Sequence, residues 1–345
     1  MTELNSAPQP EQKSNWARFA VGVVISAVAL WVILRNVDLQ QTYDALKAMD
    51  QRHLLPALVL FISTILARSI AWRTILGNKI SLGKAFFTEN EGYFLNNVLP
   101  FRLGEVGRAL VLNLTTELSF WEGFSTIIIE RFFDMAIMAG LLLSTLAFVS
   151  GADWALDASL MVGGLVVVGF LVLFFAARNP EKIKNIFNKL TARWPGLQNW
   201  GVEKLQLFLQ GLSTLREPKR FFLVVVLLLV TWILNISWYW VLLKAFVPEA
   251  KFLWAAFAVG VGSLGVAVPS TPGYIGVFEF ATVSALALFA IPESDAFAYA
   301  LVSHALYLVV TIILGLVGFS RETISIGDIF KRAQAKPGQT ELPES

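Results

Sequence analysis

Three charged residues at helical spacing, Arg102, Glu105 and Arg108, interrupt an otherwise apolar part of the chain. If this segment is helical, the positions i, i+3 and i+6 allow the carboxylate to contact both guanidinium groups, which leaves one positive charge in excess. Arginine binds phosphate through paired hydrogen bonds, so this excess favours an anionic, phosphate-bearing ligand. The alternative is that both arginines only anchor the chain at the level of the lipid headgroups.

A second charged group, Glu130, Arg131 and Asp134, lies inside a long apolar run. Glu130 and Asp134 share one helix face at i, i+4, and Arg131 reaches Asp134 at i, i+3. Charged residues at membrane depth are rare and usually face a cavity or a partner. The group is therefore either a self-neutralised clamp between helices or part of a binding site.

Glu279 and His304 are isolated ionisable residues in the last two apolar runs. Glu279 has no basic residue near it in the sequence, so we expect it to pair across the fold with Arg102, Arg108 or Arg131. We interpret His304 as a hydrogen-bonded core residue in preference to a proton carrier.

The spacing P-x-x-x-G-x-x-G occurs twice, and proline and glycine at this density interrupt helices. The first copy is Pro100, Gly104 and Gly107, preceded by Asn97, and the second is Pro269, Gly273 and Gly276, with Thr271 and Pro272 inside it. Broken helices at membrane depth are tolerated where the backbone is buried or lines a cavity. Paired breaks in two halves of a transporter indicate a binding site between them. Coincidence, in a chain with 24 Gly and 13 Pro, is the alternative.

The composition of the 345 residues excludes several classes of protein. Hydrophobic residues make up 56% and charged residues 15%, with a mean hydropathy of +0.64, which argues against a soluble enzyme and against disorder. A net charge of +2 without basic clusters gives no indication of nucleic-acid binding. The absence of cysteine and the wide separation of the two histidines argue against a metal site, and we expect no cofactor.

Eight apolar runs are long enough to cross a bilayer. They are residues 19–34, 54–72, 124–149, 160–176, 221–246, 252–268, 274–291 and 297–319, and residues 84–108 form a ninth run that we expect to enter and return on one side. We therefore expect an all-α polytopic membrane protein with about eight transmembrane helices, further re-entrant or broken helices, and two pseudo-symmetric halves.

The distribution of charge predicts the orientation. Residues 178–220 contain nine basic and three acidic residues, whereas the turns at 151–157 and 292–295 contain acids and no bases. Because loops rich in Lys and Arg stay in the cytoplasm, residues 178–220 and both chain ends are expected there. The expected organisation is a polar tail at 1–17, one membrane domain at 18–320 and a polar tail at 321–345, in the cytoplasmic membrane of a bacterium or archaeon.

Three stretches together resemble the flippase-like membrane domain of lysylphosphatidylglycerol synthetases. They are NVLPFRLGEVGR at 97–108, IERFFD at 129–134 and VPSTPGYIGVFE at 268–279. The resemblance covers nearly the whole chain and implies a protein that binds and translocates a phosphate-bearing lipid. It also implies a lipid-exposed cavity between two facing repeats with re-entrant helices, and formation of a homodimer.

Carried over by position, the resemblance matches Arg102, Glu105 and Arg108 to the first motif, Glu130, Arg131 and Asp134 to the second, and Pro272, Gly273, Gly276 and Glu279 to the third. We expect these charged residues, with Asn97 and His304, to bind the lipid, and the prolines, glycines and Thr271 of the two motifs to form the helix breaks at the cavity. One departure is His304, since the family often has arginine in the last span. A second is that only 26 residues follow Phe319, too few for the aminoacyl-transfer domain of the synthetases. We therefore expect that this protein does not synthesise aminoacyl lipid and that it is not an enzyme.

Four functions are compatible with these observations. Translocation or binding of a lipid with an anionic headgroup is the first, and no P-loop pattern is present to supply an ATPase. The others are a membrane-embedded transferase acting on a lipid phosphate, a secondary transporter of a small anion, and an accessory subunit of an envelope complex.

Overall fold

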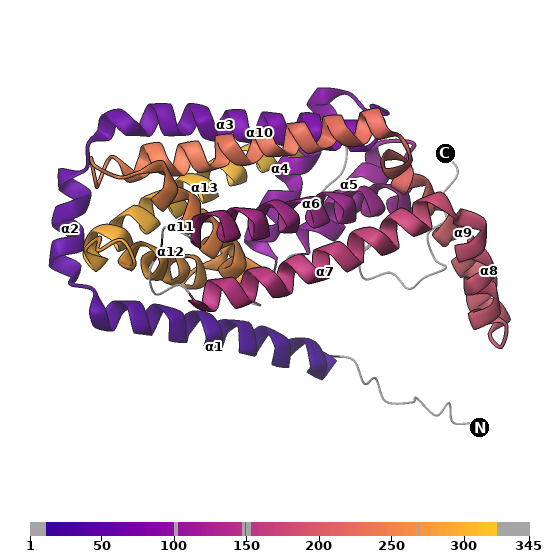
Figure 1. Ribbon diagram of the computed structural model, residues 1–345, viewed down its shortest axis with the longest axis horizontal. Coiled ribbons are helices and arrows are strands. Elements are labelled where there is room, and N and C mark those ends of the chain that lie inside the picture. Colours follow the sequence, from indigo (N-terminus) through magenta and orange to yellow (C-terminus); the bar gives the residue numbers. More distant parts are fainter. Residues whose placement is uncertain (1–11, 100–102, 147–148, 150–152, 268–269, 323–345) are drawn as a thin grey trace, which may run out of the picture.

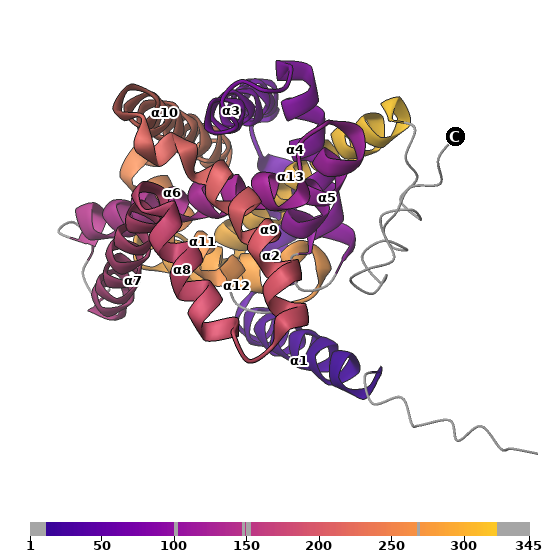
Figure 2. The ribbon, with the colours of Figure 1, turned by 90° about the vertical axis from the view of Figure 1, so that its right-hand side faces the viewer.

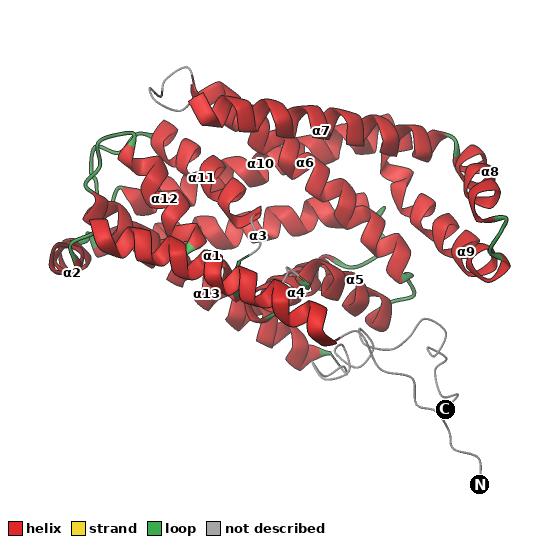
Figure 3. Cartoon of the chain, turned by 90° about the horizontal axis from the view of Figure 1, so that it is seen from below, coloured by secondary structure: helices red, strands yellow, loops and turns green. Residues whose placement is uncertain are grey.

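The fold is built from helices of two lengths. The computed structural model describes residues 12–99, 103–146, 149, 153–267 and 270–322, and these residues contain no strand (Figure 3). The helices are α1 (Gln12–Asn36), α2 (Leu39–Ala48), α3 (Leu54–Ile75), α4 (Leu82–Val98), α5 (Gly104–Thr115), α6 (Phe120–Leu146), α7 (Asp153–Arg178), α8 (Pro180–Thr191), α9 (Pro195–Gly211), α10 (Pro218–Leu243), α11 (Phe252–Ala267), α12 (Val277–Ala287) and α13 (Glu293–Arg321), with short 3₁₀ turns η1 (Gln51–His53), η3 (Leu212–Arg216) and η4 (Pro272–Tyr274).

The long helices α1, α3, α6, α7, α10 and α13 run along the long axis of the molecule (Figure 1). Within the described residues, α3, α7, α10 and α13 are long and apolar enough to cross a membrane. The pair α1–α2, bent by 85°, brings the number to five if it is counted as one span. The protein is therefore a multi-pass membrane protein, but the predicted count of eight spans is not confirmed. α6, with 27 residues, is also long enough to cross a membrane, but it carries the charged residues Glu130, Arg131 and Asp134 near its middle.

Within the run 84–108, the short helices α4 and α5 pack against each other as a hairpin, and Gly104 and Gly107 of the first P-x-x-x-G-x-x-G motif lie at the start of α5. The helices pack antiparallel and very closely. A Cβ on Gly104 would collide with the Gly92 carbonyl oxygen, and one on Gly107 would collide with the Leu95 side chain. Small residues thus permit the hairpin, whose shape agrees with a segment that enters and returns.

The second motif also lies at the turn of a helical hairpin, formed by α11 and α12. This corrects the expectation that residues 252–268 and 274–291 each cross the membrane. At about 1.5 Å per residue, the 16 residues of α11 and the 11 residues of α12 reach about 24 and 16 Å, short of the roughly 30 Å apolar layer. Gly265 allows α11 to approach Ala281 of α12.

The two hairpins enter from opposite ends and meet near the middle, α4–α5 in the right half of Figure 1 and α11–α12 in the left half. Their tips are in contact, because η4 packs on α4 and a Cβ at Gly273 would lie 3.7 Å from the carbonyl oxygen of Asn97. The expectation that the two broken elements face each other is confirmed.

The ends of the fold agree with the predicted arrangement of loops. The start of α1, the end of α13 and the α8–α9 pair lie at one end of the molecule, and α2 lies at the other (Figures 1 and 3). Viewed from the first end, α8 and α9 lie side by side across the bundle (Figure 2). The assignment of this end to the cytoplasm stays a prediction.

Candidate functional site: a charged cavity between two hairpins

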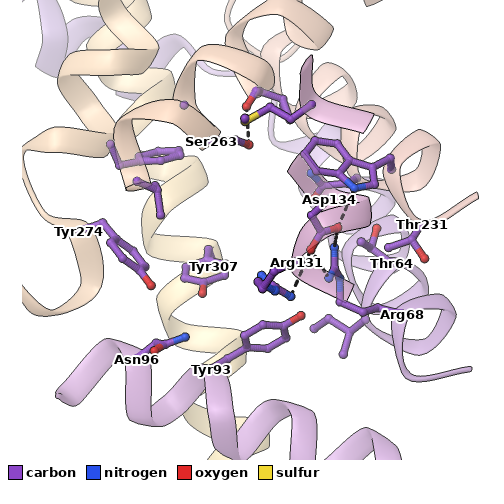
Figure 4. A pocket seen from close by; sticks show the side chains of 18 of the residues that line it. Thr64, Arg68, Tyr93, Asn96, Arg131, Asp134, Thr231, Ser263, Tyr274 and Tyr307 are labelled. Carbon is purple, nitrogen blue, oxygen red and sulfur yellow. Dashed lines mark hydrogen bonds and ion pairs between the residues drawn. The ribbon is translucent and has the colours of Figure 1, made fainter. Parts of the chain in front are cut away.

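A cavity of about 680 Å³ lies between the two hairpins and the long helices (Figure 4). Its charged residues come from α3, α4, α5 and α6, and its aromatic residues come from α3, α4, α10, η4, α12 and α13. α11 adds small and apolar residues. The charged residues are Arg68, Glu89, Glu105, Arg108, Arg131 and Asp134; together with Glu130 behind them, these residues are named here the arginine–carboxylate cluster.

Arg68 of α3 is bound to two carboxylates of α6. Its Nη1 lies 2.6 Å from Glu130 Oε1 and 2.9 Å from Asp134 Oδ2, and its Nη2 lies 2.8 Å from Asp134 Oδ1. The indole of Trp232 donates a further hydrogen bond, 2.9 Å long, to Asp134. Because Arg68 and Trp232 both bind Asp134, this part of the cluster serves as a clamp between α3, α6 and α10.

Arg108 of α5 lies deeper and is only 3% exposed. Its Nη2 is 3.0 Å from Glu130 Oε2 and 3.6 Å from Glu89 Oε1, and its guanidinium carbon lies 3.6 Å from the centre of the Trp72 ring. These contacts correct the Arg108–Glu105 half of the expected ladder, because the carboxylates paired with Arg108 belong to α4 and α6. The Arg102 half lies outside the described residues.

Arg131 is the most exposed arginine of the cluster, with 30% of its side chain accessible. Its Nη2 is 2.6 Å from Glu130 and 3.1 Å from Asp134, so the expected contact with Asp134 is confirmed. Its Nη1 is 3.7 Å from Glu105, and its Nε has no hydrogen-bond partner. Figure 4 shows Arg131 beside Tyr93 and Tyr307 in the cavity.

Glu279 and His304 are bonded to each other, which corrects the expectation of an arginine partner for Glu279. His304 Nδ1 lies 2.5 Å from Glu279 Oε1, and His304 Nε2 lies 2.7 Å from the Gly273 carbonyl oxygen. Glu279 also accepts the backbone N–H of Gly276 at 2.6 Å. His304 lines the cavity, and Glu279 stands behind it. The interpretation of His304 as a hydrogen-bonded, buried residue is confirmed.

The remaining motif residues hold the hairpins in place. Asn97 Nδ2 donates to Thr311 of α13 at 2.8 Å, and the hydroxyl groups of Ser26 of α1 and Thr271 are 3.0 Å apart. Gly273 and Gly276 have φ of 68° and 90°, which side chains with a Cβ rarely adopt. Pro272 begins η4, and Gly104 and Gly107 form the close contact of α4 with α5. Pro100, Arg102 and Pro269 lie outside the described residues.

Sequence reasoning missed Arg68 and the tyrosines of the cavity. Arg68 is the one charged residue between Leu54 and Trp72, and this isolation inside an apolar run was a usable signal. Tyr93, Tyr274 and Tyr307 come from three elements that only the fold brings together, and nothing in their spacing indicates a shared cavity.

Comparison with known proteins identifies the family. Residues 19–315 match the family described as the lysylphosphatidylglycerol synthase TM region. The chain belongs to this family. The earlier resemblance is therefore confirmed, and the cavity, both hairpins and the arginine–carboxylate cluster all lie within the matched residues.

Relatives of this lysylphosphatidylglycerol synthase TM family member occur in archaea. The glycosyltransferase AglD of Haloferax volcanii is 25% identical over 94% of this chain, which spans only 58% of the length of AglD. A UPF0104 membrane protein of Methanocaldococcus jannaschii is 28% identical over 61% of the chain and 88% of its own length. One from Methanothermobacter thermautotrophicus is 24% identical over 72% of the chain and 77% of its own length.

Proposed function

We propose that this protein binds the phosphate-bearing headgroup of an anionic lipid in the cavity and moves it across the membrane. The observation that carries the proposal is the position of the cavity, where two hairpins from opposite ends meet beside an accessible arginine. The cavity has the size usual for small-ligand sites, which is about 300–1,000 Å³.

Arg131 is the residue best placed to bind a phosphate. Glu130 and Asp134 hold its Nη2, and its exposed side chain lies beside the hydroxyl-bearing rings of Tyr93 and Tyr307. A phosphate oxygen would accept charge-assisted hydrogen bonds from the guanidinium. Arg68 and Arg108 are more deeply buried than Arg131, and their contribution is to hold Glu130 and Asp134, the carboxylates that position Arg131.

The remainder of the lining favours a lipid over a small inorganic anion. Phe61, Met135, Met138, Leu264 and Phe278 present apolar surface toward the same cavity. A free phosphate or sulfate gains nothing from such surface, whereas the glycerol and the first acyl carbons of a lipid are stabilised by it. Movement would follow the lipid gradient or an ion gradient.

Reconstituted protein tests the proposal. In phosphatidylcholine liposomes, we expect fluorescent phosphatidylglycerol to move between leaflets faster than fluorescent phosphatidylcholine. The fluorescence lost to a membrane-impermeant quencher measures this rate. The matched controls are protein-free liposomes and Arg52→Gln, which changes an exposed arginine outside the cavity. Equal rates with and without protein would refute the proposal.

A membrane-embedded transferase is the second candidate, favoured by the similarity to the glycosyltransferase AglD. It requires covalent change of the lipid. If fluorescent lipid phosphates incubated with the protein and nucleotide sugars acquire a sugar, detected by mass spectrometry, the transferase replaces translocation as the primary activity.

A further inference from the structure

The Glu279–His304 pair joins the tip of the second hairpin to α13 through a continuous set of hydrogen bonds. His304 Nε2 contacts the carbonyl oxygen of Gly273, and Nδ1 contacts Glu279 Oε1. The other carboxylate oxygen, Oε2, accepts the N–H of Gly276. Both side chains are only 5% exposed, so these bonds form in a site almost free of water.

This pattern fixes the number of protons in the pair. A carbonyl oxygen can only accept, so the proton at His304 Nε2 must be donated to Gly273. The 2.5 Å contact between Nδ1 and Glu279 Oε1 then requires a second proton, whether it belongs to the imidazolium or to the carboxylic acid. Without it, the lone pair of Nδ1 would face a carboxylate, and the contact would be repulsive.

We propose that the Glu279–His304 pair is a proton-binding site that locks the α11–α12 hairpin to α13 when loaded and releases the hairpin tip when the proton leaves. The proposal rests on the proposed lipid translocation and adds its coupling ion. The tip also contacts α1, through Thr271 and Ser26, and α4, on which η4 packs. Its two glycines at positive φ allow the backbone to change conformation.

Release of the proton is a simple ionisation. The loaded pair, imidazolium and carboxylate, gives neutral imidazole, carboxylate and a proton that enters the cavity, which His304 lines. The product carries a buried carboxylate that keeps the N–H of Gly276 but has lost its cationic partner, and such a charge is unstable unless water reaches it. Movement of the tip away from α13 would supply that water.

Among the residues that the structure describes, no Lys or Arg forms an ion pair with Glu279. η4, α13 and α10 contribute the phenols of Tyr274, Tyr307 and Tyr239. α11 contains no ionisable residue, and neither does the stretch of α1 beside Gly276, Ser26–Leu30. Across the cavity stand the charged residues of the arginine–carboxylate cluster. An anionic headgroup bound there favours the loaded pair, so binding of lipid and binding of the proton reinforce each other.

The substitution Glu279→Gln removes the titrating proton of the pair but keeps its hydrogen-bond geometry. The glutamine oxygen can accept from Gly276 while its amide N–H donates to a neutral His304, which reproduces the loaded pattern without a titrating proton. We therefore expect this variant to fold and to remain locked at every pH. Glu249→Gln, at an exposed carboxylate, is the matched control.

Two measurements test the proton site. A spin label on Ile275→Cys, an exposed position of the tip in a chain without cysteine, reports tip mobility in detergent. We expect the mobile fraction to rise at least threefold between pH 5.5 and 8 in the parent and in Glu249→Gln, and to stay low in Glu279→Gln. Phosphatidylglycerol translocation in liposomes should rise over the same range and be at least tenfold slower in Glu279→Gln at pH 8.

The two measurements distinguish this inference from the proposed function. If mobility behaves as expected but no lipid moves, the proton site stands and the proposed translocation fails. If lipid moves at a rate that neither pH nor Glu279→Gln alters, translocation stands and the proton site is overturned. The same holds if Glu279→Gln keeps the pH-dependent mobility of the parent.

Discussion

Arg68 of α3 and Asp134 of α6 form a two-point ion pair, with nitrogen–oxygen distances of 2.8 and 2.9 Å. The pair joins α3 to α6, and the indole of Trp232 of α10 donates a hydrogen bond to the same carboxylate. Three long helices are thus held together at one carboxylate.

Replacement of Arg68 is expected to destabilise the fold more than it affects the ligand. Arg68→Gln removes the two-point partner of Asp134 and one of the arginines paired with Glu130, and breaking a buried ion pair typically costs about 3–5 kcal/mol. Thermal unfolding in detergent measures the loss, and the double variant with Asp134→Asn should lose less than the sum of the single variants. Arg52→Gln should unfold like the parent. Additive single changes would contradict the pair.

Arg131→Lys is expected to weaken lipid binding selectively. Lysine keeps the charge and can still contact Glu130, but it loses the planar set of donors that matches phosphate. Loss of one charge-assisted hydrogen bond corresponds to about tenfold weaker binding of phosphatidylglycerol. Titration of the purified variant with short-chain phosphatidylglycerol measures this. Unchanged affinity in folded protein would remove Arg131 from the binding site.

Substitutions of two glycines, Gly104 and Gly83, test the close packing of α4 against α5. Gly104→Ala places a methyl group against Gly92 and Asn96 and is expected to cost about 1–3 kcal/mol of stability. Gly83→Ala has open space around it and removes a weak helix former, so it should be neutral or slightly stabilising. The unfolding temperatures of both variants, compared with that of the parent, test this prediction. Equal effects would mean that the hairpin is not closely packed.

Cysteine labelling tests the orientation. Gln41→Cys on α2 and Asn185→Cys on α8 are exposed positions at opposite ends of the molecule. Because residues 178–220 are strongly basic, a membrane-impermeant maleimide added to intact cells should label position 41 and spare position 185 until the membrane is permeabilised. The reverse pattern would invert the topology.

Hydropathy predicted the long helices well, because an uninterrupted apolar run such as residues 54–72 forms one long helix. It failed at residues 252–291, where two short helices in a hairpin have the same hydropathy as two crossings, and only packing such as Gly265 against Ala281 distinguishes them. The charged residues were recognisable as a site, since charge in an apolar run needs a partner. The partners themselves were not, because Glu279 and His304, or Arg68 and Asp134, are joined only by tertiary structure.

The pairing of α4 with α13 has a consequence for biogenesis. The polar face of α4, including Glu89, Asn90 and Glu91, is fully buried, and α13 packs along this helix, with Gly318 against Glu91. α13 leaves the ribosome some two hundred residues after α4. Until then the first hairpin lacks its cover, so it must wait in a hydrated or chaperoned state while the long helices insert, and the last helix completes the bundle.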